Sequence, residues 1–154
     1  MESLYSLLRK KSAVCGSKCA ILGLEESVTI SYRELVDYVI RTANWLTQLG
    51  VTKNTRFGIL LQNTPEILLL ELAAGIVGAA VVPLDELRDT CDRMSFKLAS
   101  TGSKLLFTRM NSGRELANLK KIVRIIKISS FADFKNEIFN YSPKLEFEPT
   151  KNLA

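Results

Sequence analysis

The residues of this sequence that could do chemistry are three cysteines, one small basic turn and one basic segment. Cys15 and Cys19 have the spacing C-x3-C, which is neither a redox C-x-x-C pair nor half of a recognisable zinc motif, and Cys91 stands alone. The chain contains no histidine, which excludes Ser-His-Asp and Cys-His nucleophilic machinery and every histidine-ligated metal site within it. We therefore predict three reduced, structurally ordinary thiols, and we assign no catalytic, cofactor-binding or metal-binding residue.

A phosphate-binding loop is the second kind of site for which the sequence can be searched. Neither G-x-x-x-x-G-K-[ST] nor G-x-G-x-x-G occurs in it. The nearest small basic turn is Asn111-Ser112-Gly113-Arg114. Because Ser112 and Glu115 have the spacing of a capping box, we interpret this turn as the start of a short helix.

The excess of positive charge, +5 for the whole chain, lies mainly late in the sequence. A basic face can attract phosphates or nucleic acid. No aromatic residue interleaves with these charges after Phe107, so a stacking platform for single strands is not indicated. The face is then either solvated or covered by further protein, and we predict no nucleic-acid partner. Only Glu115 opposes the basic residues of this interval, which are Lys104, Arg109, Arg114, Lys120, Lys121, Arg124 and Lys127.

The composition is that of a globular protein, with 154 residues of which 47% are apolar and 24% charged. The longest apolar run, Ile67–Val82, contains Glu71 and two glycines and is shorter than the ~20 residues of a membrane span. At the amino terminus, Glu2 precedes a short apolar stretch and the basic cluster follows it, an order that is wrong for a secretory signal. We expect a cytoplasmic protein without a membrane span.

Helical periodicity is clearest over residues 31–50, where Ser31 and Glu34 form a capping box and Gly50 follows the last turn. Residues 55–61 form a short apolar run without helical spacing, which predicts a buried strand. A second helix is predicted to begin at Thr64-Pro65-Glu66, with Thr64 as its cap, and to continue to about Val77.

The stretch GIVGAAVVPLD, residues 75–85, is a joint between a helix and a strand rather than one element. Gly78 can adopt the left-handed conformation that ends a helix. Ala79–Val82 then forms a strand, which Pro83 ends because proline has no N–H to donate.

The same alternation continues along the chain. Helices are predicted over 89–101, from Ser112 onward, and over 131–140 after Ser130, with strands over 104–108 and 122–128 between them. Residues 19–24 and 28–31 form a hairpin around Glu25-Glu26. The fold class is α/β, a mostly parallel twisted sheet with helices on both faces, in one domain over residues 1–154.

Three stretches, in register, resemble the adenylate-forming (AMP-binding) ligase superfamily of acyl-CoA synthetases, luciferases and peptide-synthetase adenylation domains. Residues 30–51 resemble its first motif, a Thr/Ser-Tyr-x-Glu-Leu opening to a helix that ends in Leu-Gly-Val. Residues 55–85 resemble the following strand, the Asn-x-Pro-Glu helix start and the Ala-Gly/Val-Pro-Leu ending, and residues 100–108 resemble a later Ser-Gly-Ala-Lys-x-Leu-x-Thr strand. The matching positions are Ser31, Tyr32, Glu34, Leu35, Leu49, Gly50, Asn63, Pro65, Glu66, Gly78, Val82, Pro83 and Leu84.

The resemblance implies that a carboxylic acid is activated by ATP to an acyl-adenylate and passed to a thiol of coenzyme A or a carrier protein. It also implies Mg²⁺ and a Gly/Ser/Thr-rich phosphate loop, neither of which has recognisable residues here. We expect the chain to be the first part of a larger ligase, ending upstream of the phosphate loop, binding no cofactor and inactive alone.

A non-catalytic module that binds a protein or ligand on the same scaffold is the alternative. A fragment is expected to expose an apolar face toward the missing remainder of the ligase, and such a face can also form a homodimer.

Overall fold

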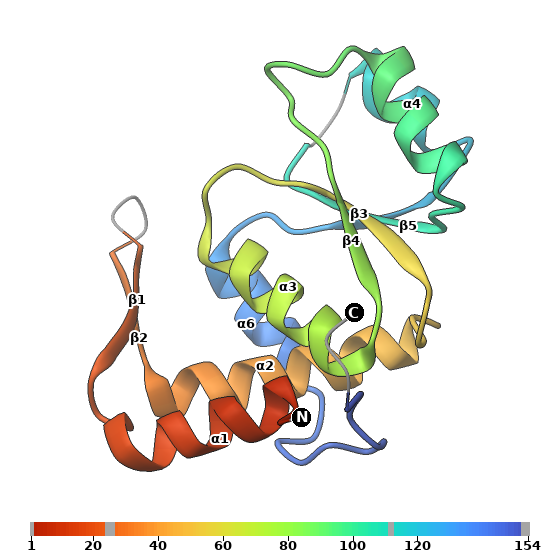
Figure 1. Cartoon of the computed structure of the whole chain (residues 1–154). Coiled ribbons are helices and arrows are strands. Elements are labelled where there is room, and N and C mark those ends of the chain that lie inside the picture. The colour runs from red at the N-terminus through yellow and green to blue at the C-terminus, as the bar shows by residue number, and fades with distance from the viewer. Residues whose placement is uncertain (1, 24–26, 111–112, 152–154) are drawn as a thin grey trace.

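Four parallel strands form the centre of the molecule, in the order β4-β3-β5-β6 (Figure 1). They are β3 (Arg56–Leu60), β4 (Ala80–Pro83), β5 (Leu105–Thr108) and β6 (Arg124–Lys127). This computed structural model describes residues 2–23, 27–110 and 113–151. The four predicted strands are confirmed, each shorter than or shifted from its predicted range by one to three residues, as is usual at element ends.

Helices cover both faces of this sheet, so the predicted fold class is confirmed. On one face pack α2 (Tyr32–Gln48), α3 (Pro65–Val77) and α6 (Phe131–Ile138), and on the other pack α4 (Cys91–Ser100) and α5 (Arg114–Leu119).

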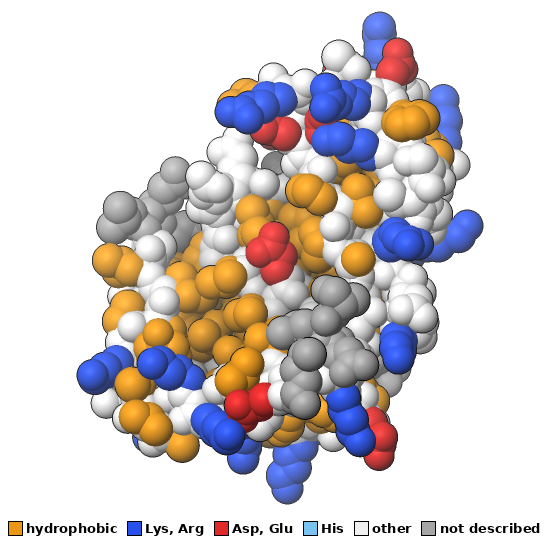
Figure 2. Space-filling view, viewed as in Figure 1, with side chains coloured by type: hydrophobic (Ala, Val, Ile, Leu, Met, Phe, Trp, Pro, Cys, Tyr) orange, Lys and Arg blue, Asp and Glu red, His pale blue; other side chains and the backbone are white. Residues whose placement is uncertain are grey.

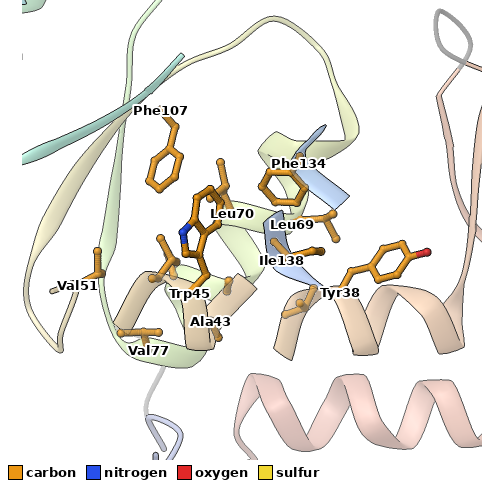
Figure 3. Close-up of a cluster of buried hydrophobic side chains, with 14 of the residues drawn as sticks. Tyr38, Ala43, Trp45, Val51, Leu69, Leu70, Val77, Phe107, Phe134 and Ile138 are labelled. Atoms are coloured by element: carbon orange, nitrogen blue, oxygen red, sulfur yellow. The ribbon is translucent and has the colours of Figure 1, made fainter. Parts of the chain in front are cut away.

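The larger core lies between the sheet and the first group of helices, with Trp45 of α2 among its aromatic residues (Figure 3). The Trp45 ring meets Phe107 of β5 and Phe134 of α6 edge-on, with centroids 5.3 and 5.8 Å apart. Edge-to-face pairs of this kind add about 0.5–1.5 kcal/mol each beyond the burial of apolar area.

The smaller core lies on the opposite face and depends on Gly58 in the middle of β3. A Cβ atom at Gly58 would lie 2.7 Å from Leu98 of α4 and 2.8 Å from Leu106 of β5, and both side chains are fully buried. The absence of a side chain at Gly58 therefore lets α4 pack closely on the central strand.

The ends of α2 match the sequence prediction. The Ser31 N–H donates to Glu34 Oε2 at 2.8 Å and the Glu34 N–H donates to Ser31 Oγ at 3.3 Å, which completes the capping box. Gly50 after the helix has a φ of +87°, the left-handed conformation that was expected of it.

The ends of α3 match the sequence prediction only in part. Gly78 has a φ of +84° and its N–H donates to the Ala74 carbonyl, so the left-handed helix end is confirmed. The predicted side-chain cap is wrong, because Thr64 occupies the cap position without any side-chain hydrogen bond to the helix. Pro83 is the last residue of β4, opposite Ile59, and is tolerated because β4 is an edge strand.

Three other helix starts or ends differ from the prediction. α4 begins at Cys91 rather than Asp89, because Thr90 caps it by accepting from the Arg93 N–H. α5 begins at Arg114 with Gly113 at the cap position and no side-chain cap bond, while Ser112 of the predicted capping box lies outside the described residues. α6 is capped by Ser130 as predicted and ends at Ile138 rather than at residue 140.

The amino-terminal region adds a helix that was not predicted, α1 (Leu4–Cys15), capped by Ser3. After it, β1 (Cys19–Gly23) and β2 (Val28–Ser31) pair antiparallel, so the hairpin strands are confirmed. The turn at Glu25-Glu26 lies outside the described residues. Cys15, Cys19 and Cys91 are free thiols.

The tail after α6 runs back along α2, where Arg41 Nη1 donates to the Tyr141 carbonyl and a buried amide makes three further hydrogen bonds. Asn44 Nδ2 donates to the carbonyls of Ser142 and Lys144, and Asn44 Oδ1 accepts from the Glu146 N–H. Farther along, the Thr150 N–H donates to the Ile76 carbonyl at 2.9 Å, which joins the tail to the end of α3. Within the described ranges, no helix is both long and apolar enough to cross a membrane.

Two glycines with the same conformation and different surroundings test how tightly this tail is packed. Replacing Gly50 by Ala meets nothing within 4 Å and is expected to cost about 1–2 kcal/mol of unfolding free energy through left-handed strain alone. Gly78→Ala carries the same strain, and its Cβ also collides with Thr150 Oγ1. We expect Gly78→Ala to cost at least about 1 kcal/mol more in urea unfolding.

The control is the same pair of substitutions in a Thr150→Ala background. There the excess cost of Gly78→Ala should shrink while that of Gly50→Ala stays unchanged. Equal costs at the two glycines in the unmodified chain would contradict the packing of the tail described here.

Candidate functional site

The carboxyl ends of the four strands share one edge of the sheet, which we call the carboxyl edge. It comprises the loops that follow the strands, residues 61–64, 84–90, 109–113 and 128–130, of which 111–112 lie outside the described part. After β3 the chain moves to β4 on one side, and after β5 it moves to β6 on the other. In open α/β sheets ligands bind where the direction of connection reverses, here between β3 and β5.

A buried ion pair lies at this reversal point. Glu66, in the first turn of α3, is fully buried, and its Oε1 accepts from Arg109 Nη2 at 2.5 Å. Arg109 follows β5 directly and is partly exposed. Glu66 Oε2 and Thr64 Oγ1 are buried acceptor atoms without a hydrogen-bond partner among the described residues. The pair joins the start of α3 to the end of β5 across the point where a ligand is expected.

The loop after β4 lines an open cavity of about 600 Å³ at the same edge. The most buried charge there is the Asp89 carboxylate, which accepts from Lys97 Nζ at 2.6 Å and lies 3.0 Å from Arg93 Nε. It also accepts the Asp85 N–H at 3.0 Å. The cavity is lined by Leu60, Leu61, Gln62, Asn63, Pro83, Leu84, Asp85, Glu86, Leu87, Arg88, Asp89, Arg93 and Lys97.

The negative charge of Asp89 in this cavity is balanced by the hydrogen-bond donors around it. The hydrogen bond from Lys97, and secondarily that from the Asp85 N–H, holds the pKa of Asp89 below its usual value despite the opposing effect of burial. Asp85 in turn accepts from the N–H groups of Leu87 and Arg88, which closes the loop on itself. The cluster therefore stabilises the loop after β4, and the lowered pKa of Asp89 makes that carboxylate a poor proton acceptor near neutral pH.

The described residues of this edge do not fit the phosphates of a nucleotide. A carboxylate in the first turn of a helix competes with a phosphate for the positive end of the helix dipole. The four helices that start at this edge carry Glu66, Asp92, Glu115 and Asp133 in their first turns. Within the described ranges no group of three metal-ligating side chains is present either. We therefore assign no step of nucleotide chemistry to these residues.

The turn singled out from the sequence falls partly outside what the structure describes. Asn111 and Ser112 lie outside it, Gly113 occupies the cap position of α5, and Arg114 is exposed. The other basic residues of this interval are exposed too, apart from Arg109, which is partly exposed and pairs with Glu66. The six exposed members are Lys104, Arg114, Lys120, Lys121, Arg124 and Lys127.

The parallel sheet, with helices on both faces and a reversal of connection at its carboxyl edge, identifies this as an open α/β domain. The particular family follows from a family model, described as AMP-binding enzyme, that matches residues 8–152. The chain belongs to the AMP-binding enzyme family.

Relatives agree with this assignment. The chain is 30% identical over 141 residues to a plipastatin synthase protein of Bacillus subtilis (strain 168), covering 92% of this chain and 5% of that protein. It is 29% identical over 106 residues to the long-chain-fatty-acid–CoA ligase FadD13 of Mycobacterium tuberculosis (strain ATCC 25618 / H37Rv), covering 69% of this chain and 21% of that protein. The chain thus spans about a fifth or less of the length of these two relatives.

Solved structures share the fold. A Mycobacterium tuberculosis fatty acyl CoA synthetase superposes with a TM-score of 0.80 at 24% identity, over 97% of this chain and 30% of that one. The inhibitor-bound N-terminal domain of FACL13 from Mycobacterium tuberculosis gives a TM-score of 0.82 at 23% identity, over 99% of this chain and 40% of that one.

The Glu66–Arg109 pair can be tested by breaking it from one side. Arg109→Met leaves the Glu66 carboxylate buried without its cation and is expected to cost about 3–5 kcal/mol in urea unfolding. The double variant Glu66→Leu/Arg109→Met removes both charges and is expected to be clearly more stable than Arg109→Met alone. Additive costs in the double variant would show that the two side chains do not act as a pair.

The pH dependence of stability tests the Asp89 cluster. Because folding lowers the pKa of Asp89, its contribution is complete above the unfolded pKa of about 3.9 and is lost as the pH falls through the lower folded value. Lys97→Met should reduce the unfolding free energy at pH 7 by about 1–3 kcal/mol. The two unfolding curves should converge in strong acid, where Asp89 is protonated in both proteins.

Arg93 is the matched control, since it contacts the same carboxylate while its own side chain is mostly exposed. Arg93→Met should cost less than about 1 kcal/mol at pH 7. An effect of Lys97→Met that stays constant down to about pH 2, below the unfolded pKa of an aspartate, would assign it to lost packing rather than to Asp89.

Proposed function

We propose that this chain is the amino-terminal scaffold of an AMP-forming carboxylic acid ligase. In that reaction the carboxylate of the acid attacks the α-phosphorus of ATP and releases pyrophosphate, which gives an acyl-adenylate. A thiol of coenzyme A or a carrier protein then attacks the acyl carbon and releases AMP. The observation that carries the proposal is the AMP-binding enzyme match over residues 8–152.

The role of a scaffold is supported by what the family-like positions do in this structure. Ser31 and Glu34 cap α2, Pro65 starts α3, and Gly78 ends it. The acidic first turns at the carboxyl edge support the scaffold role, because carboxylates there oppose the binding of nucleotide phosphates. We propose that ATP, Mg²⁺ and the thiol cofactor bind to the larger ligase, and that this portion fixes the sheet beside them.

The nature of the acid follows from the relatives only as a class. One matched relative is named as a long-chain-fatty-acid–CoA ligase and another as part of a plipastatin synthase. We propose an acyl substrate and a thiol acceptor, with coenzyme A and a carrier-protein phosphopantetheine as the two acceptors to be compared.

Carboxylate-dependent exchange of pyrophosphate into ATP tests this function directly. The purified 154-residue chain is expected to show no exchange with fatty acids of short, medium or long chain or with amino acids. The full-length natural protein that contains this sequence is expected to exchange with at least one of these acids, because the adenylation step is reversible. A circular dichroism spectrum typical of α/β structure is required of both samples.

Two results would contradict the proposal. Exchange by the 154-residue chain alone would show that its own residues adenylate. A folded natural protein without exchange for any acid would leave the non-catalytic binding module as the better account.

A further inference from the structure

α3 is apolar on both its buried and its open side apart from Glu71, and a helix with apolar residues all round is typically buried. Its sequence, PEILLLELAAGIV, contains two charged residues, Glu66 and Glu71. One side of it packs into the larger core through Leu69, Leu70 and Ala73. The opposite side is open, with Leu68 41% exposed.

α1 extends the same open surface. None of its twelve residues is fully buried. It lies so close to α3 that a Cβ atom at Gly75 would be 2.8 Å from Leu4 Cδ2. On the next turn of α1, Leu8 is half-buried and Leu7 is 45% exposed. We call this surface the α1–α3 face, and it comprises Leu4, Leu7, Leu8, Leu68, Glu71 and Leu72.

Figure 2 shows hydrophobic side chains gathered continuously over α1 and α3, in the hollow beside the β1–β2 hairpin. On the other side of the sheet, exposed apolar residues such as Phe96 stand singly. Phe96 of α4 is 71% exposed, yet the only other exposed apolar residue of its helix is the small Ala99. Single exposed apolar residues are normal on a monomer, whereas a continuous apolar face spanning two helices marks an interface.

We infer that the α1–α3 face is the surface on which the remainder of the ligase packs, an inference that rests on the proposed function. The matched region makes up 30% and 40% of the two solved chains described above, so those proteins carry a larger body of polypeptide beyond it. The occupant is a mainly apolar surface of that body with a cation or hydrogen-bond donor opposite Glu71. A second copy fits less well, because a two-fold contact through this face brings Glu71 from both copies into one interface.

Side-chain footprinting of the full-length natural protein and of the 154-residue chain tests this assignment. In the 154-residue chain, Leu7 and Leu68 should be modified readily. In the full-length protein their modification should fall at least about fivefold, since packing in the core of an interface removes them from water. Phe96 is the internal control and should react equally in both proteins.

Substitution at the face gives a second and independent measurement. Leu68→Glu should improve the solubility of the 154-residue chain and reduce its binding of a hydrophobic dye, because it breaks an exposed apolar surface. In the full-length protein the same change should lower the soluble yield, because it places a carboxylate in a buried interface. Phe96→Glu should not produce this opposition between the two proteins.

Equal labelling of Leu68 in both proteins would overturn the inference. So would protection in the full-length protein that disappears on dilution, which would identify a second copy as the occupant, and so would a natural protein no longer than 154 residues. Pyrophosphate exchange measured on the same sample separates the two proposals. A protected face without exchange refutes the ligase function alone, and exchange with an unprotected face refutes the interface alone.

Discussion

The structure depends on β3 being hydrogen-bonded on both sides by parallel strands. β3 pairs with β4 along one side and with β5 along the other, so its backbone groups are satisfied without water. Parallel neighbours can be reached only by crossover connections, and these place helices on the two faces of the sheet. The residues of β3 then have to suit both faces. Phe57 fills the larger core, and Gly58 makes room for Leu98 of α4.

The ion pair at the carboxyl edge follows from the same arrangement. The helix that leaves β3 starts beside the end of β5, which places the Glu66 carboxylate in a buried position next to Arg109. Such a pair is a poor source of net stability, because Glu66 loses its hydration and Arg109 loses part of its own. Its value lies in specificity, since either charge alone would be costly there. The pair therefore favours the one packing in which the start of α3 and the end of β5 meet.

Sequence reasoning succeeded where structure is determined locally and failed where it depends on distant residues. The capping box of Ser31 and Glu34 and the left-handed Gly78 were predictable because each acts within a few residues of chain. The Glu66–Arg109 pair spans 43 positions, and the sequence showed only an acid suited to a helix start and a base that looked solvated. α1 was missed because its half-buried leucines acquire their packing from α2 and α3, and no strong periodicity marks it.

These observations also explain how family membership can be evident in a chain to which no catalytic residue is assigned. Residues that start, cap and end helices are constrained by backbone geometry, and that geometry must be kept wherever the fold is kept. The chemistry of adenylation needs phosphate-binding groups, and the acidic helix starts at this carboxyl edge oppose the binding of phosphates. A sheet whose helices leave an apolar face open, and whose ligand-binding edge is held together by a buried ion pair, has the properties expected of a scaffold. Under the proposed function its contribution to catalysis is to fix the position of neighbouring polypeptide, and that contribution depends on the same packing that makes the fold recognisable.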